Sequence, residues 1–311
     1  MDKEKFIHAY LNAVPFPVHD VQASRKLEAD RSTRAARVAF TGNIDDVVLE
    51  TEAGKTGVRI YTPQGRGPFP AILYLHGGGF SIGSPETSDN LCRVVAATAN
   101  AVLISVDYRL APEYKFPTAL EECYRIALWI SENDIALNVQ GDQLAIAGDS
   151  AGGNLAASLC LLARQRRGFR PVHQALICPL LDLQTPHAVK VGKLPGLMNR
   201  MHDSQAFIDY YLEAPEDAAN PLASPLLATD FHGLPPATII TAGLDALAAE
   251  GVSYSERLKA AGIEVVNRHY PGQVHDFVLF IKPLQEARDA AIALGEDLRR
   301  AFVGQGCMKQ N

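Results

Sequence analysis

A serine between two glycines, Gly148-Asp149-Ser150-Ala151-Gly152, stands where an apolar, β-branched run meets a segment of small residues. This G-x-S-x-G pattern is typical of a sharp strand-to-helix turn that raises the serine hydroxyl above the end of a sheet. A hydroxyl in that position can attack a carbonyl carbon once a base takes its proton. The pattern predicts a nucleophile at Ser150, and the alternative is a structural Gly-Ser turn.

A second glycine-rich string, His76-Gly77-Gly78-Gly79, follows the apolar run Ala71–Leu75. Consecutive glycines let the backbone approach a substrate closely and direct N–H groups at one point, as the stabilisation of an oxyanion requires. The position after a buried strand also favours a site, because ligands of open α/β sheets bind at the carboxyl ends of the strands. The alternative is a flexible surface loop.

The base for this nucleophile is expected at a histidine that lies beyond Ser150 in the chain. His275 is favoured because it lies in a turn-rich loop directly after the last predicted strand. The acid should follow a late strand between these two residues, as Asp245 does, and Asp182 is its competitor. Asp245 also suits the N-cap of the helix that follows it, and the two roles are compatible. The other histidines considered lie in strands or in the segment interpreted as a cap: His173, His187, His202, His232 and His269.

These residues need a scaffold of alternating strands and helices. From residue 70 onward, apolar runs alternate with amphipathic helical patterns, which is typical of a mostly parallel sheet covered on both faces. The predicted buried strands are Ala71–Leu75, Ala101–Val106, Gln143–Ala147, Gln174–Cys178, Thr238–Thr241 and Glu264–His269. A hairpin of Asp46–Glu52 and Thr56–Tyr61 precedes them.

Two segments break this alternation. Residues 1 to about 40 carry two helical patterns, separated by Pro15-Phe16-Pro17. The second pattern is basic and runs to about Val38. Residues 183–236 are rich in Pro, His and Gly, with one helical piece near 203–212. An insertion that does not join the sheet usually lies over one edge of it. We therefore expect one domain over residues 1–311, with a helical cap formed by about 1–40 and 183–236.

Composition excludes several classes of protein. The 311 residues are 47% hydrophobic and 21% charged, which is enough core-forming material for a folded globule. The net charge is −6, and acidic residues interrupt the cationic cluster over 25–37, as on a solvated helix face. Both features argue against a nucleic-acid partner. Five cysteines without CxxC spacing predict reduced thiols and no metal site. No apolar stretch is long enough for a membrane span and no signal-peptide pattern is visible, so we expect a cytoplasmic protein.

Three motifs in this order resemble the hormone-sensitive lipase family of serine esterases, which includes bacterial acetyl esterases. The motifs are His76–Phe80, Asp107–Glu113 and Gly148–Asn154, and the resemblance spans roughly residues 70–280. It implies an α/β-hydrolase fold, in which a mostly parallel central sheet carries helices on both faces. It further implies a catalytic triad of Ser150, Asp245 and His275. The oxyanion hole would be formed by the N–H groups of Gly78, Gly79 and Ala151, with His76, Gly77 and Asp149 supporting these motifs.

The chain departs from the family pattern at two places. The usual Asp-Pro-Leu-x-Asp-Glu run appears as Asp245-Ala246-Leu247-Ala248-Ala249-Glu250, so two supporting positions differ. The common His-Gly-Phe appears as His275-Asp276-Phe277, which places an additional carboxylate beside the base. If Asp276 points at the imidazole it can alter the pH profile, and if it faces water it changes little.

The expected activity is two-step acyl transfer, in which a serine carboxylesterase hydrolyses short-acyl-chain esters through an acyl-enzyme intermediate, without cofactor or metal. The expected partner is a small-molecule ester, and a homodimer is compatible with the sequence. An amidase or a lipase with the same triad is the alternative among enzymes. A lipase would expose an apolar, mobile lid, whereas the cap carries Lys190, Lys193, Arg200 and Asp203. A non-catalytic small-ligand receptor on the same fold is the alternative from another class, since fold alone does not establish function.

Overall fold

The structure, a computed structural model, describes residues 3–11, 13, 16–191 and 205–308, without the side chains of 10–11 and 305–308. Eight strands form one sheet in the order β1-β2-β4-β3-β5-β6-β7-β8. Their bounds are β1 (Gly42–Thr51), β2 (Gly54–Pro63), β3 (Phe69–Leu75), β4 (Val102–Asp107), β5 (Val139–Asp149), β6 (His173–Ile177), β7 (Ala237–Leu244) and β8 (Val265–Val274). The β1–β2 and β2–β4 pairs are antiparallel and the others are parallel, so the predicted mostly parallel sheet is confirmed.

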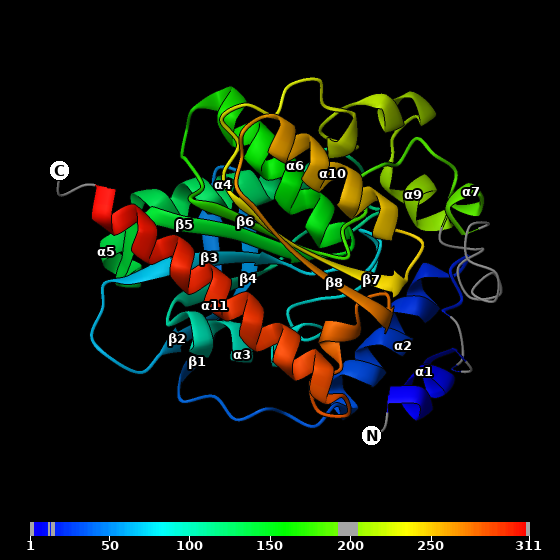
Figure 1. Cartoon of the computed structure of the whole chain (residues 1–311), viewed down its shortest axis with the longest axis horizontal. Helices are drawn as coiled ribbons and strands as arrows, with labels where there is room; N and C mark the ends of the chain where they lie inside the picture. Colours follow the sequence, from blue (N-terminus) through cyan, green and yellow to red (C-terminus); the bar gives the residue numbers. More distant parts are fainter. Residues whose placement is uncertain (1–2, 12, 14–15, 192–204, 309–311) are drawn as a thin grey trace.

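Helices cover both faces of this sheet. Helices α3 (Asp89–Ala99) and α11 (Gln285–Met308) lie on one face, and α4 (Thr118–Glu132), α6 (Ala151–Arg166) and α10 (Ala248–Ala260) lie on the other (Figure 1). Four helices gather at the end of the sheet toward which β7 points (Figure 1): α1 (Lys3–Leu11), α2 (Val21–Arg34), α7 (His187–Val191) and α9 (Gln205–Tyr211). Shorter pieces are α5 (Asp134–Leu137) and the 3-10 turns η2 (Pro215–Ala219), η3 (Pro225–Leu227) and η4 (Phe277–Leu279).

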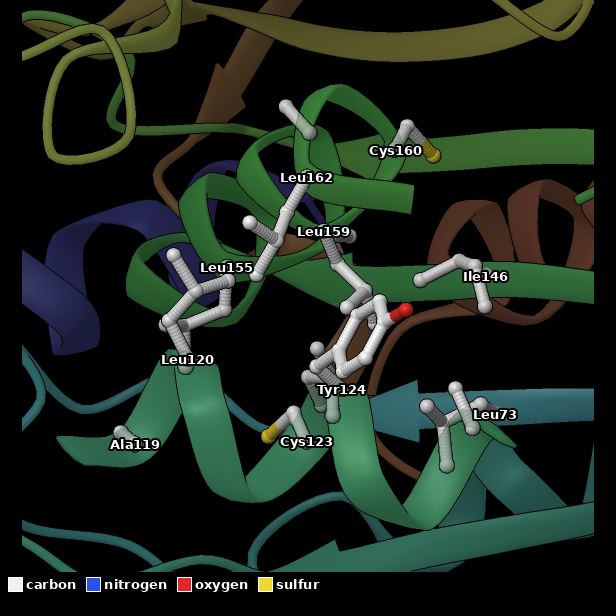
Figure 2. Packing of buried hydrophobic residues seen from close by; sticks show 14 of the residues in the cluster. Leu73, Ala119, Leu120, Cys123, Tyr124, Ile146, Leu155, Leu159, Cys160 and Leu162 are labelled. Atoms are coloured by element: carbon white, nitrogen blue, oxygen red, sulfur yellow. The ribbon is translucent and has the colours of Figure 1, made fainter. Parts of the chain in front are cut away.

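The central strands are buried on both faces, which explains why they appear in the sequence as unbroken apolar runs. In β3, Leu73 belongs to the core shared with α4 and α6, while Tyr74 belongs to the core shared with α3 and α11. Both side chains are fully buried. Figure 2 shows the first core, where Leu120 of α4 lies against Leu155 of α6. The sheet is thus packed between two layers of helices, which position its strand ends.

The last strand, β8, is longer than the sequence predicts. It continues to Val274 through Pro271 and Gly272, a stretch that we expected to be a loop. Because β8 lies at the edge of the sheet, no strand beyond it needs the N–H group that proline lacks. The register with β7 shifts at Gly243, where a Cβ would lie 2.1 Å from the carbonyl oxygen of Pro271. His275 therefore follows the strand directly.

Helix α2 corrects two expectations about the N-terminal segment. It ends at Arg34 and not near Val38, and its first turn is capped by Asp20, whose side chain accepts from the Ala23 N–H at 3.0 Å. Among its cationic residues, Lys26 and Arg34 are exposed, but Arg25 faces the rest of the protein. Arg25 donates to the backbone oxygens of Ser81 at 2.8 Å and of Ala111 at 2.9 Å. Arg25 also pairs with Glu113 at 2.7 Å, so α2 is tied to the loops after β3 and β4.

The cysteines within the described residues are free and buried: Cys92, Cys123, Cys160 and Cys178. The side chain of Cys307 and several cap positions named above, including Lys193, Arg200, His202 and Asp203, lie outside the described residues. Over the part of the chain that the structure describes, none of the helices is long and apolar enough to cross a bilayer.

Candidate active site

Ser150 lies at the turn between β5 and α6 with φ 52° and ψ −116°, a conformation that residues with a side chain rarely adopt. The flanking glycines leave space for this turn. A Cβ on Gly148 would lie 2.3 Å from the carbonyl oxygen of Gly152, and one on Gly152 would lie 1.9 Å from that of Leu75. The Ser150 N–H donates to the carbonyl oxygen of Ile177 at 2.8 Å. The start of α6 is therefore pressed against the end of β3, and the serine is fixed at the carboxyl edge of the sheet.

The three side chains predicted as a triad lie in a row. The Nε2 atom of His275 is 2.9 Å from Ser150 Oγ, and its Nδ1 atom is 2.8 Å from Asp245 Oδ2. Asp245 follows β7, and its side chain is fully buried. Its second oxygen, Oδ1, accepts from the Leu247 N–H at 3.0 Å, so the carboxylate is held at both oxygens. In this geometry the Nδ1–H can donate to Asp245 while Nε2 accepts from the serine hydroxyl.

The competing candidates have other partners. Asp182 accepts from the backbone N–H groups of Gln184 at 2.9 Å and Thr185 at 3.0 Å, as an acid that caps a turn does. The strand and cap histidines bond elsewhere, His173 with Thr238, His269 with Thr241, and His232 with Asp230. His187 lines the cavity described below. Asp245 is not the N-cap of α10, which begins at Ala248 and has Leu247 in that position.

The loop after β3 carries two glycines with positive φ, 115° at Gly78 and 58° at Gly79. These values favour glycine, and a Cβ on Gly78 would lie 2.2 Å from the carbonyl oxygen of Ile82. Ala151 is the first residue of α6, and the N–H groups of a first helical turn have no acceptor within the helix. The loop glycines and Ser150 line one cavity. The glycine loop and the first turn of α6 thus both lie next to the serine.

The same loop is held by the residue His76. Tyr108 donates from its hydroxyl to the His76 carbonyl oxygen at 2.7 Å, and the two rings stack at 4.3 Å. Burial lowers the pKa of His76 to about 4, so its ring is neutral near pH 7. The neutral ring donates from Nδ1 to the Gly77 carbonyl oxygen at 2.7 Å. The contacts of His76 therefore hold the backbone directly before Gly78 and Gly79 in place.

Replacing Gly78 with alanine is expected to lower kcat by about 10²- to 10³-fold if the loop N–H groups bind the oxyanion, because the added Cβ forces the loop to move. The rate on p-nitrophenyl butyrate, with circular dichroism to check folding, measures this effect. Gly54→Ala is the matched control: Gly54 also has positive φ, 107°, but a Cβ there meets nothing within 4 Å. An equal loss of rate in both variants would contradict the role of Gly78.

Three carboxyl groups lie near the imidazole, those of Asp245, Asp276 and Asp149. Burial disfavours the charged form of His275, but Asp245 and Asp276 outweigh it and raise its pKa well above the usual range of histidine. Burial raises the pKa of Asp276, against the effect of His275. Burial and the nearby Asp276 raise the pKa of Asp149 to about 7, although the Tyr74 hydroxyl donates to it at 2.5 Å. The site thus concentrates carboxyl groups around one base.

A cavity of about 580 Å³ lies over these residues. Its floor includes Ser150 and His275, and apolar side chains from α1 and α9, among them Phe6 and Phe207, form part of its wall. This volume lies in the range of pockets that enclose small molecules. The cavity is therefore suited to a small, largely apolar ligand placed against the serine hydroxyl.

Sequence reasoning did not assign three residues that contact this machinery. Tyr108 lies in the motif Asp107–Glu113, but nothing in the motif shows that its hydroxyl reaches the His76 carbonyl. Tyr74 is part of an apolar strand pattern, and its bond to Asp149 has no local signal. Cys178 follows β6, with φ 43°, and its sulfur lies within 4.8 Å of Asp245 and His275.

The sheet is mostly parallel and carries helices on both faces. A strained serine turn joins β5 to α6, and a histidine follows the last strand. Together these features define an α/β-hydrolase. A family model described as alpha/beta hydrolase fold matches residues 72–279. The chain belongs to this family, and its hormone-sensitive lipase branch, predicted from the motifs, is confirmed.

Individual relatives agree with this assignment. An arylesterase of Saccharolobus solfataricus is 32% identical over 305 residues, which cover 96% of this chain and 97% of the relative. An ethyl acetate hydrolase of Pseudomonas putida is 34% identical, with 91% and 92% covered. The solved structure of an esterase of Pyrobaculum calidifontis superposes with a TM-score of 0.88 at 36% identity, covering 95% and 97% of the two chains. The predicted class, a carboxylic ester hydrolase, is thereby confirmed.

Proposed function

We propose that the chain is a serine carboxylesterase that hydrolyses short-acyl-chain esters through Ser150, His275 and Asp245. Two contacts next to the cavity support this proposal. Ser150 Oγ lies 2.9 Å from His275 Nε2, and His275 Nδ1 lies 2.8 Å from Asp245 Oδ2. His275 takes the serine proton as Ser150 attacks the ester carbonyl carbon, and Asp245 holds the imidazole in the required tautomer. The alcohol leaves with that proton, and water then releases the acid.

The oxyanion of each tetrahedral intermediate is bound, in this proposal, by the N–H groups of Gly78, Gly79 and Ala151. Backbone donors that are already oriented stabilise the developing charge without reorganisation. The positive φ of both glycines and the place of Ala151 at the start of α6 support this role. The neutral imidazole of His76 and the Asp149 carboxyl group, which packs against Gly77, hold the loop in place.

We also propose that residues 1 to about 40 and 183–236 form a cap on a single domain, residues 1–311. Cavity-lining side chains come from both segments, for example Phe6 and Phe16 from the first and Phe207 and Ile208 from the second. A cavity of limited volume lined by these groups favours a small acyl chain over a long one. The homodimer and the cytoplasmic location remain predictions from the sequence.

The substrate class is tested by a series of p-nitrophenyl esters from acetate to laurate, together with p-nitroacetanilide. The expected result is a kcat/KM that is highest between acetate and butyrate and falls for longer chains, because longer chains exceed the volume beside Ser150. Hydrolysis of the anilide should be much slower. A rate that rises with chain length would favour a lipase, and preference for the anilide would favour an amidase. No turnover of any substrate would favour a receptor.

A further inference from the structure

The Nε2 atom of His275 has two oxygen neighbours and not one. Ser150 Oγ lies at 2.9 Å and Asp276 Oδ2 at 3.2 Å. The Asp276 side chain is 15% exposed, and its other oxygen, Oδ1, is buried with no hydrogen-bond partner among the described residues. The carboxyl group therefore points at the imidazole. The sequence His275-Asp276-Phe277 alone did not decide this direction.

One ring nitrogen cannot serve both oxygens, because Nε2 offers either one N–H or one lone pair. If Nε2 carries the proton, the imidazolium pairs with the Asp276 carboxylate and cannot accept the proton of Ser150. If Asp276 carries the proton and donates it to Nε2, the lone pair that Ser150 needs is again occupied. A single proton shared between Nε2 and Oδ2 thus blocks the base in either position.

Other elements place titratable groups around this pair. Asp245 faces the opposite side of the imidazole from the loop after β7, Asp149 lies at the end of β5, and Cys178 follows β6. Burial, then the charges of Asp245 and Asp276, raise the pKa of Cys178, so it stays a neutral thiol near pH 7. Groups of α2 and α7 that line the same cavity are Glu28, Arg31 and His187.

We propose that Asp276 is a positioning residue that competes with Ser150 for Nε2 of His275, so that the base becomes available only when the His275–Asp276 pair has released one proton to solvent. The proposal rests on the esterase mechanism proposed above. Only this proton moves: it leaves Nε2 or Oδ2 for water, and the freed lone pair on Nε2 accepts the proton of Ser150. The ionised Asp276 then stabilises the imidazolium that forms as Ser150 attacks.

The sign of the pH dependence follows from these two effects. The carboxylate of Asp276 contributes to the raised pKa of His275, so the blocked, protonated pair persists to higher pH. Without that carboxylate, the imidazole loses its proton at lower pH and activity appears earlier. The same change removes a charge that stabilises the imidazolium, so the rate at high pH falls. The two pH profiles are therefore expected to cross.

The experiment compares kcat/KM against pH for the wild type and Asp276→Asn. Asp276 has φ 52° and ψ 29°, which asparagine adopts readily, and Asp276→Gly is a second variant that suits the same backbone. The acidic limb should move down by about one to two pH units, and the high-pH plateau should fall by about threefold or more. Glu132→Gln, at the exposed end of α4, removes the same charge and should change neither quantity.

A second readout does not depend on turnover. The midpoint of the His275 titration, followed by NMR with ¹³C-labelled histidine and assigned with His275→Gln, should fall by a similar amount in Asp276→Asn. An unchanged midpoint, or a loss of rate that is equal at all pH values, would overturn the proposal. If the wild type hydrolyses no ester, the proposed function fails while the midpoint still tests Asp276. If Ser150→Ala abolishes hydrolysis but the profiles do not cross, only the role of Asp276 fails.

Discussion

Ser150→Ala is expected to lower kcat on p-nitrophenyl butyrate by roughly 10⁶-fold, the scale of effect seen when a triad nucleophile is removed from a serine hydrolase. The hydroxyl is the atom that would form the acyl bond, and no other hydroxyl is bonded to His275 Nε2 within the described residues. Both serine and alanine carry a Cβ, so the strained turn at φ 52° imposes a similar demand on the backbone in the variant. The remaining activity should reflect substrate binding and the oxyanion donors alone.

The control is Ser158→Ala, which makes the same chemical change two turns further along α6. Ser158 is buried and bonds to the Asn154 side chain at 3.4 Å, outside the candidate triad. We expect this variant to retain the wild-type rate within a few-fold. Labelling with a p-nitrophenyl phosphonate and mass spectrometry should show one modified residue in the wild type and none in Ser150→Ala. Retention of more than about one per cent of activity by Ser150→Ala would exclude it as the nucleophile.

Asp245→Asn is expected to lower kcat by about 10⁴-fold, because it selects the wrong imidazole tautomer. The Leu247 N–H bonds to Oδ1 and requires an oxygen there, so the new amide group must present its NH₂ to His275 Nδ1. An NH₂ group donates, so Nδ1 must accept and the proton of the neutral ring moves to Nε2. A protonated Nε2 cannot take the proton of Ser150.

The rival acid supplies the control for this prediction. Asp182→Asn removes a carboxylate that bonds to the Gln184 and Thr185 N–H groups, and an asparagine oxygen can accept from the same donors. Its rate should stay within a few-fold of the wild type. A large loss in Asp182→Asn together with a small one in Asp245→Asn would reverse the assignment of the acid. Rates should be compared at several pH values, because Asp245 also raises the pKa of His275.

Much of the fold could be predicted because its signals are local. The strands of a sheet that is covered on both faces are largely apolar along their length, so runs such as Ala71–Leu75 identify them directly. The extension of β8 through Pro271 had no such signal. Proline and glycine are typical of turns, and only the position of β8 at the sheet edge makes them acceptable within a strand.

The candidate site was accessible from the sequence for a related reason. A tight turn at Ser150 and a backbone with positive φ at Gly78 each require glycine at particular positions, and such requirements leave a readable pattern. The contact of Arg25 with the loops after β3 and β4 left no such pattern in the sequence. A charged residue on a helix gives the same sequence pattern whether its side chain faces water or carbonyl oxygens.

The sequence by itself therefore determined the order of strands and helices, the glycine-dependent turns and the kinds of side chain available for acyl transfer. Only the tertiary structure decided which of these side chains meet. Ser150 and His275 are 125 positions apart, and their 2.9 Å contact depends on the strand order that brings the ends of β5 and β8 to one edge. The direction of the Asp276 carboxyl group was decided in the same way. A residue in the left-handed conformation after β8 can direct its side chain at water or at the base, and the packing of the fold directs this one at the base.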